Sequence, residues 1–102
     1  MYEDEISIRL ANLRLQKGVS ARDMSLSLGL NPGYINNIEC GKALPAMRPF
    51  LYICEYLKIS PSDFFDFESK YPEKINELIK DLKNLNEDEL DSVIAIVKNI
   101  LK

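Results

Sequence analysis

The side chains that most often perform enzyme chemistry are scarce in this sequence. It has no histidine, the commonest general base and metal ligand, and only two cysteines, Cys40 and Cys54. Two cysteines are too few for a zinc site, and although their spacing permits a disulfide, the absence of a signal peptide favours free thiols. The sequence therefore predicts a protein that is not an enzyme and needs no metal or other cofactor.

Composition bounds the class of protein further. A chain of 102 residues has the size of a single domain, and 46% hydrophobic with 28% charged residues is typical of a globular fold. No apolar run is long enough to span a membrane, and the start of the chain, Tyr2-Glu3-Asp4-Glu5, is acidic where a signal peptide would be basic. We therefore expect a soluble, cytoplasmic protein without a membrane partner.

Charge is distributed unevenly along the chain. Residues 1–65 contain seven Lys or Arg and seven Asp or Glu, whereas residues 66–102 contain six Lys and nine acids. The net charge of −3 thus originates in the C-terminal third. Because a nucleic-acid-binding protein needs a basic face rather than a basic average, this net charge does not exclude such a partner.

Hydrophobic periodicity and helix-ending residues predict an all-α fold. Ile6, Leu10 and Leu13 recur at helical spacing, and Gly18 follows as a helix stop. No stretch has the alternation expected of a strand. The expected helices are a first over about residues 4–17, a second between Ser20, in a capping box with Asp23, and Gly29, a third capped by Asn31 with Pro32 at its first position and ending before Gly41, a fourth around Phe50–Leu57, and a brief fifth from Ser60 to Phe65.

The stretch from Ala21 to Ile38 has the features of two helices joined by a sharp turn. Helices that cross steeply need a small side chain at their closest approach, which Ser25 supplies, and a turn residue that tolerates positive φ, which Gly29 supplies. The polar positions of the second helix should then point outwards. Its inner face is expected to be anchored by apolar contacts of Ile35 and Ile38 with Met24 and Leu28.

On these residues the chain resembles the phage-repressor family of helix-turn-helix proteins, also called Cro/repressor-like or XRE-type. The matching elements are Leu13-Arg14-x-x-Lys17-Gly18-Val19-Ser20, Gly29-Leu30-x-x-x-Tyr34-Ile35-x-x-Ile38-Glu39-x-Gly41-Lys42 and Leu57-x-Ile59-x-x-x-x-Phe64-Phe65. They follow one another in the family's order and spacing over residues 6–65. The resemblance implies a five-helix domain over residues 1–66, usually dimeric, that binds double-stranded DNA and inserts the helix near residues 31–40 into the major groove.

Carried over residue by residue, the family's base-reading positions fall at Pro32, Gly33, Asn36 and Asn37. Pro32 and Gly33 depart from the family's pattern, because neither has a side chain that can hydrogen-bond to a base. Direct readout is therefore expected from Asn36 and Asn37, since an Asn amide can pair with N6 and N7 of adenine. The alternative for either residue is an ordinary solvated helix position.

Contacts to the phosphate backbone are expected from polar and cationic side chains around this helix. Two departures weaken them, because Ala21 and Cys40 stand where the family commonly has Gln and Asn. We therefore expect modest affinity for each subunit and a need for dimerisation. The expected phosphate ligands are Ser20, Asn31 and Tyr34, which can donate hydrogen bonds, and Arg22, Lys42 and Arg48, which can neutralise charge.

The resemblance also implies a structural ion pair. Arg14 and Glu39 match a pair that bridges the first and third helices in this family. Such a pair would set the angle of the helix that enters DNA, and its alternative is two unrelated surface charges.

The C-terminal segment, residues 67–102, is expected to form a helical hairpin. Apolar residues recur at helical spacing before and after Asn86, which with Glu89 offers another capping box. A hairpin this short cannot bury its own apolar faces, so it must pack either on the first five helices or on a second copy of the chain. We favour a homodimer interface formed by Leu90, Val93, Ile94, Val97, Ile100 and Leu101.

Together these features predict a dimeric, sequence-specific DNA-binding transcriptional regulator that represses by occupying its operator. The alternative is a protein–protein interaction module with the same fold and weak or vestigial DNA binding. The departures at Ala21, Pro32, Gly33 and Cys40 favour that alternative. Nothing in the sequence indicates a small-molecule ligand.

Overall fold

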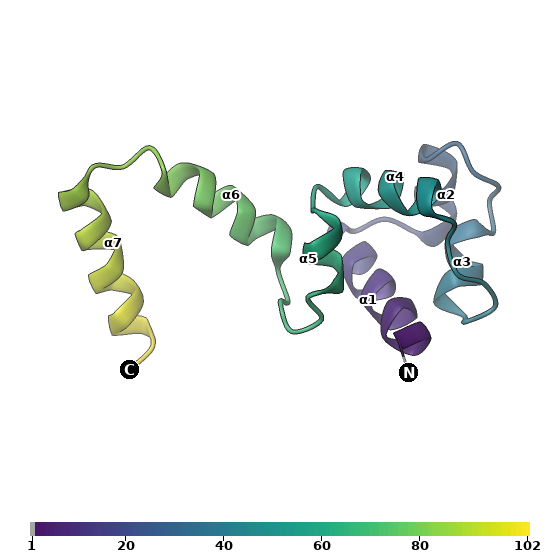
Figure 1. Ribbon diagram of the computed structural model, residues 1–102, viewed down its shortest axis with the longest axis horizontal. Helices are drawn as coiled ribbons and strands as arrows, with labels where there is room; N and C mark the ends of the chain where they lie inside the picture. The colour runs from purple at the N-terminus through teal and green to yellow at the C-terminus, as the bar shows by residue number, and fades with distance from the viewer. Residues whose placement is uncertain (1) are drawn as a thin grey trace.

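Seven helices and no strand make up residues 2–102, the part of the chain that the computed structural model describes (Figure 1). The predicted all-α fold is thus confirmed. Met1, the first residue of the predicted domain over residues 1–66, lies outside the described residues. The helices are α1 (Tyr2–Lys17), α2 (Ala21–Ser27), α3 (Tyr34–Glu39), α4 (Met47–Leu57), α5 (Pro61–Phe65), α6 (Pro72–Leu82) and α7 (Glu87–Ile100).

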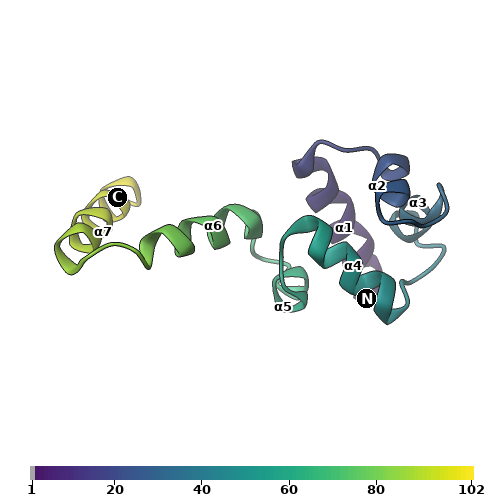
Figure 2. The same ribbon diagram turned by 90° about the horizontal axis from the view of Figure 1, so that it is seen from above.

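The first five helices pack together, and the last two extend away from them. In Figure 1, α2 and α3 lie at one end of the molecule, α6 leads away from α5, and α7 lies at the opposite end. The view from above shows the same separation (Figure 2). The molecule is consequently elongated, with extents of 50 × 27 × 23 Å.

Local sequence signals set several helix ends, as predicted. The Ser20 hydroxyl accepts a hydrogen bond of 3.0 Å from the backbone N–H of Asp23 at the start of α2, but within residues 2–102 the Asp23 side chain does not return the second bond, so Ser20 is an N-cap and not half of the predicted capping box. Asn86 and Glu89 form a reciprocal capping box at the start of α7, with both bonds at 2.9 Å. These bonds satisfy backbone donors that the first turn of a helix otherwise leaves without a partner.

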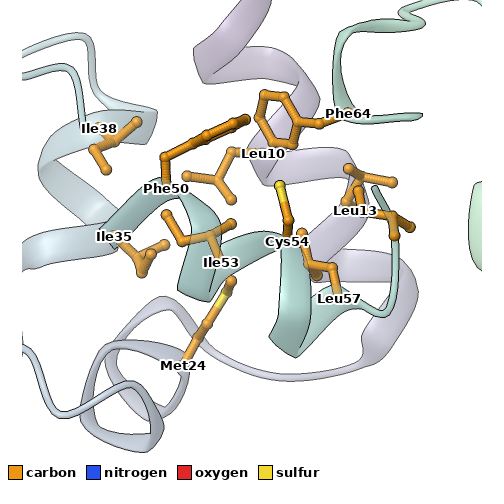
Figure 3. Close-up of a cluster of buried hydrophobic side chains, with 11 residues drawn as sticks. Leu10, Leu13, Met24, Ile35, Ile38, Phe50, Ile53, Cys54, Leu57 and Phe64 are labelled. Carbon is orange, nitrogen blue, oxygen red and sulfur yellow. The ribbon is translucent and has the colours of Figure 1, made fainter. Parts of the chain in front are cut away.

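The hydrophobic core lies between α1, α2, α3, α4 and α5 (Figure 3). The apolar residues that recur at helical spacing on α4, namely Phe50, Ile53, Cys54 and Leu57, are all buried. The rings of Phe50 and Phe64 meet edge to face with their centroids 5.1 Å apart, which joins α4 to α5. The buried hydrophobic residues are Leu10, Leu13, Met24, Ile35, Ile38, Phe50, Ile53, Cys54, Leu57, Ile59 and Phe64.

The third helix begins later than the sequence predicts. Asn31 does not cap it; instead the Asn31 Oδ1 accepts a hydrogen bond from the N–H of Gly33 at 3.1 Å, and the Asn31 carbonyl accepts one from Tyr34 at 3.1 Å. The helix starts at Tyr34, with Gly33 as its N-cap. The prediction of a helix starting at Asn31-Pro32 was therefore wrong, because the Asn side chain closes a local turn and competes with helix formation.

The two C-terminal helices are present as predicted, but they do not lie side by side as a closed hairpin. After the short connection over residues 83–86, α7 turns away from α6 at a steep angle (Figures 1 and 2). The connection is made of consecutive turns, in which the N–H of Asn84 bonds to the Asp81 carbonyl and that of Leu85 to the Leu82 carbonyl. No residue of α7 is buried, so its apolar stripe is not covered by this chain.

The first turn of α6 is attached to the preceding helices. Pro72 is buried, and a Glu73 carboxylate oxygen lies 3.6 Å from Nζ of Lys17 on α1. Asn76 Nδ2 donates a hydrogen bond of 2.9 Å to Oδ2 of Asp63 on α5. This bond is the main reason that the pKa of Asp63 is lowered, and together the contacts set the direction in which α6 leaves the domain.

Arg9 holds the chain between α5 and α6, a role that helical periodicity did not predict. Its side chain is buried, and its guanidinium donates hydrogen bonds to the carbonyl oxygens of Asp63 at 2.7 Å, Phe64 at 2.9 Å and Ser69. A guanidinium has five N–H donors in a fixed fork, so one side chain can bond to three carbonyls at the end of α5 and in the segment that follows it. Arg9 therefore ties the end of α5 and the segment that leads to α6 to helix α1.

The two cysteines should react differently. Both are free, but Cys54 is 2% exposed in the core and Cys40 is exposed. Burial, with a smaller contribution from the charge of Asp63, raises the pKa of Cys54 to about 11, so its reactive thiolate is almost absent near neutral pH. We expect iodoacetamide at pH 8 to label only Cys40 in the native protein and both cysteines in denaturant, as measured by mass spectrometry. Rapid labelling of Cys54 without denaturant would contradict the packing described here.

Candidate nucleic-acid interface

Helices α2 and α3 are joined by a turn of the kind that the sequence predicts. Gly29 has φ of 73°, a left-handed conformation that side chains with a Cβ rarely adopt. The N–H of Leu30 bonds to the carbonyl of Ser25 at 3.0 Å, which closes the end of α2. The chain therefore reverses within the few residues between the two helices.

Ser25 fastens the beginning of α3 to α2. Its side chain is fully buried, and its hydroxyl donates to the Ala21 carbonyl at 2.8 Å and accepts from the backbone N–H of Ile35 at 3.0 Å. The sequence predicted only that a small side chain must stand here. The hydroxyl does more, since it satisfies a buried N–H in the first turn of α3 that would otherwise have no partner.

The end of α3 is held by two side chains of α1. The Ser7 hydroxyl donates a hydrogen bond of 2.7 Å to the carbonyl of Ile38. The Arg14 guanidinium forms a two-pronged ion pair with the Glu39 carboxylate, Nε to Oε2 at 2.8 Å and Nη2 to Oε1 at 2.9 Å, and also donates to the carbonyl of Val19 at 2.8 Å. Ser7 and Arg14 are two turns apart on α1, so they lie on the same face of α1 and both bind the end of α3.

The ion pair between Arg14 and Glu39 that the resemblance implies is thus present, and it is largely shielded from solvent. The two side chains are 15% and 10% exposed. The hydrogen bond to Glu39 raises the pKa of Arg14, which keeps the guanidinium charged. Because Glu39 is the one acidic residue of α3 and is neutralised on the inner side, the outer side of α3 presents no acidic side chain.

The two asparagines predicted to read bases lie on the exposed face of α3, but their amides differ. Asn36 Oδ1 accepts a weak hydrogen bond from the Cys40 thiol at 3.6 Å. No side-chain hydrogen bond of Asn37 is recorded within residues 2–102, so its amide is available to a ligand. A Cβ at Gly33 would lie 4.0 Å from Asn37 Nδ2, and the missing side chain there leaves the space beside Asn37 open.

The six predicted phosphate ligands lie in or beside α2 and α3, apart from Arg48 in the first turn of α4, and most of them are exposed. Tyr34 is the exception, because it is half-buried and packs against the hydrophobic core. The side-chain oxygens of Ser20 and Asn31 already accept backbone hydrogen bonds, which leaves a hydroxyl proton and an amide group to donate outwards. No ion pair within residues 2–102 involves the exposed cations Arg22, Lys42 and Arg48.

Sequence reasoning missed the polar groups that position this surface. Ser7 and Arg9 lie on the inner face of α1, where the periodicity predicts apolar residues, and both are buried. The available signal was a polar residue at a core position of an amphipathic helix, because such a residue needs a hydrogen-bond partner. Carbonyls at the ends of helices such as α3 and α5 are candidate partners, because the helix itself leaves them without donors. The sequence could not say which carbonyl each side chain meets.

Groups for other chemistry are few among the described residues. Residues 2–102 contain no cluster of three or more side chains that could hold a metal ion. Over the same residues, no helix has both the length and the apolarity needed to cross a bilayer. The surface that α2 and α3 present is suited to hydrogen bonding and to weak charge neutralisation.

Removal of the Glu39 carboxylate should destabilise the protein more than removal of an exposed glutamate. Glu39→Ala leaves the shielded Arg14 guanidinium without its counter-charge, and we expect a loss of about 3 kcal/mol in the free energy of unfolding. Glu55→Ala, at an exposed position of α4, should change it by less than about 0.5 kcal/mol. Chemical denaturation followed by circular dichroism measures both, and equal effects would show that the ion pair does not hold α3.

Comparison with known proteins agrees with this geometry. A family model described as a helix-turn-helix domain matches residues 8–70, which is more than half of the chain and includes all of α2 and α3. Among curated proteins and among solved structures, none matches significantly. The match to the family model covers the same elements that position Asn36 and Asn37, and on that ground the chain belongs to the helix-turn-helix domain family, as an XRE-like member.

Proposed function

We propose that this protein is a dimeric, sequence-specific transcriptional repressor that inserts α3 into the major groove of double-stranded DNA in the cytoplasm. The observation that carries the proposal is the pair of exposed amides, Asn36 and Asn37, on a helix whose other side is fixed to α1 and α2. An α-helix with its side chains is about 10–12 Å in diameter, which suits a major groove about 12 Å wide.

Base recognition in this proposal depends chiefly on Asn37. A bidentate contact to adenine needs both the oxygen and the nitrogen of the amide. One of the two lone pairs of the Asn36 oxygen accepts a weak hydrogen bond from the Cys40 thiol, whereas no such bond occupies the Asn37 amide among the described residues. Asn36 then has a supporting role, and Pro32 and Gly33 contribute a close backbone approach rather than side-chain readout.

Attraction to the phosphate backbone is modest. Each subunit offers three exposed cations, Arg22 on α2, Lys42 just after α3 and Arg48 in the first turn of α4, so a dimer would neutralise about six phosphates. Counterion release then predicts a slope of about −5 in a plot of log affinity against log salt concentration. Ser20, Asn31 and Tyr34 add neutral hydrogen-bond donors to the phosphates.

Two substitutions separate base reading from charge neutralisation. In mobility-shift titrations over a range of salt concentrations, Lys42→Ala should make the slope of log affinity against log salt concentration shallower by about one unit for each subunit. It should weaken binding to all duplexes by the same factor. Asn37→Ala should leave the slope unchanged and reduce discrimination between duplexes by about 1–3 kcal/mol.

Lys83→Ala is the matched control, since Lys83 is the exposed C-cap residue of α6, a helix that leads away from α3 (Figure 1). It should behave as the wild type. Binding of the wild type that is equal for all duplexes selected from a random pool would contradict sequence-specific recognition.

A dimer would bring two copies of α3 onto one face of DNA, with the half-sites about 34 Å apart. The exposed stripe of α7 supports such an interface, because Ile100 is 75% and Leu101 78% exposed and Ile94 and Val97 are also exposed. Leu90 and Val93, which belong to the same stripe, are half-buried. Apolar area of this extent on a helix without a partner indicates an interaction surface.

Deletion of α7 tests the dimer directly. A chain that ends at Leu85 loses no buried residue and should retain the fold of α1 to α6. Light scattering should give the mass of two chains, each of 11.7 kDa, for the full-length protein and the mass of one chain for the shortened protein. An unchanged association state would show that the subunits meet elsewhere.

A second candidate function is a protein-interaction module. An apolar groove between α1, α4 and α5 is lined by the exposed side chains of Leu44, Met47 and Phe65, and DNA binding does not require it. The departures at Ala21, Pro32, Gly33 and Cys40 favour this alternative as well. The salt titrations above distinguish the two functions, because a pure protein-interaction module would bind no duplex even at low salt.

A further inference from the structure

The charges of α7 are arranged asymmetrically along the helix. Four of its first five residues are acidic, and the only charged side chains in its last turn and at the end of the chain are lysines. These side chains are exposed, and none of them forms an ion pair anywhere in residues 2–102. The six charged residues are Glu87, Asp88, Glu89, Asp91, Lys98 and Lys102.

Four of these residues lie along one edge of the apolar stripe. Successive residues of an α-helix are rotated by about 100° about its axis, so the spacing places Glu87, Asp91, Lys98 and Lys102 on the same side of the stripe. We call these four residues the charged edge. Asp88 lies on the face opposite the stripe, and the edge opposite the charged edge has no lysine.

The charged edge distinguishes between the two ways in which two copies of α7 can pair. Two antiparallel helices related by a twofold axis bring the same edge of each helix together, whereas two parallel helices bring opposite edges together. In the antiparallel arrangement, the acidic beginning of one charged edge lies against the basic end of the other. In the parallel arrangement, the acidic first turns of both helices lie side by side and repel each other.

The spacing also defines one register. Asp91 and Lys98 are placed symmetrically about a point between Ile94 and Ala95, and Glu87 and Lys102 are placed symmetrically about the same point. A single twofold axis at that point therefore pairs Asp91 with Lys98 and Glu87 with Lys102 of the second copy. The centre of the apolar stripe, midway between Ile94 and Val97, lies one residue further along α7, so the same axis places the two stripes against each other with an offset of about 3 Å.

We infer that α7 binds α7 of a second copy in the antiparallel orientation, about a twofold axis beside Ile94, with the charged edges of the two copies in contact. The inference rests on the dimer proposed above and adds its orientation and register. Charged residues that flank an apolar seam are known to set the orientation of paired helices. The opposed macrodipoles of antiparallel helices favour the same arrangement.

The charge pattern has one simpler explanation, which the test must distinguish from antiparallel pairing. Acids at the beginning of a helix and lysines at its end stabilise that helix by interacting with its own macrodipole. Under this explanation every charge reversal weakens the helix, and two reversals weaken it more than one. Under the antiparallel pairing, two complementary reversals restore attraction across the interface.

The experiment is sedimentation equilibrium on the full chain and its charge-reversed variants. Asp91→Lys and Lys98→Glu, each alone, should raise the dimer Kd by about tenfold, because each turns two attractive contacts of the dimer into repulsive ones. The double variant D91K/K98E should return the Kd to within about threefold of the wild type, and an equimolar mixture of the two single variants should form heterodimers. D88K is the matched control, since it reverses a charge near the helix start on the face away from the stripe.

The outcomes separate this inference from the dimer on which it rests. A wild-type dimer that single reversals affect no more than D88K would overturn the antiparallel register and leave the dimer intact. A double variant weaker than both single variants would also overturn it and assign the charges to the helix macrodipole. A monomeric wild type would overturn both proposals and leave the stripe of α7 to a different protein.

Discussion

The candidate DNA-binding surface depends on how α3 is held in place. A helix of six residues is too short to be stable alone, so its conformation must come from tertiary contacts. Ser25 provides a partner for the N–H of Ile35 at the beginning of α3, and Ser7 and Arg14 bind the last residues of the helix. With its inner side fixed at both ends, α3 can turn Asn36 and Asn37 only towards solvent. The interior of the domain therefore determines what the exterior can recognise.

The acidic part of the molecule and the candidate DNA-binding surface lie at opposite ends of its length. The acids that make the net charge negative are concentrated in α6 and α7, and these helices lead away from α2 and α3 (Figure 1). Phosphates near α3 would therefore encounter Arg22, Lys42 and Arg48 and few acidic side chains. The direction in which α6 and α7 leave the first five helices is set by the hydrogen bonds of Arg9 and by the contacts of Glu73 and Asn76. A negative net charge is thus compatible with an anionic partner, because charges separated by more than about 10 Å are largely screened in salt solution.

The departures from the family's pattern and the late start of α3 leave few side chains that could read bases. Asn31 closes a turn with Gly33 instead of capping a helix, which shortens α3 and exposes the backbone before it. Gly33 and Pro32 present no hydrogen-bonding side chain, and the Asn36 oxygen is engaged by Cys40. In the proposed function, recognition by one subunit is consequently concentrated on few groups, with Asn37 foremost. A surface with so few contacts gains most from a second subunit, and the uncovered stripe of α7 offers the means.

Much of this fold follows from the sequence by itself, because its signals are local. Helical periodicity, the caps at Ser20, Ser60 and Asn86 and the glycine stops determined nearly all of the helix positions, and the apolar spacing determined the buried face of α4. The start of α3 could not be predicted in the same way, because Asn31 can cap a helix or close a turn and only the surrounding structure selects between them. The partners of Ser7, Arg9 and the Ser25 hydroxyl, and the open angle between α6 and α7, depend on which distant segments meet in space. Contacts between segments far apart in sequence leave no periodic trace along the chain, and for that physical reason the tertiary structure alone decided them.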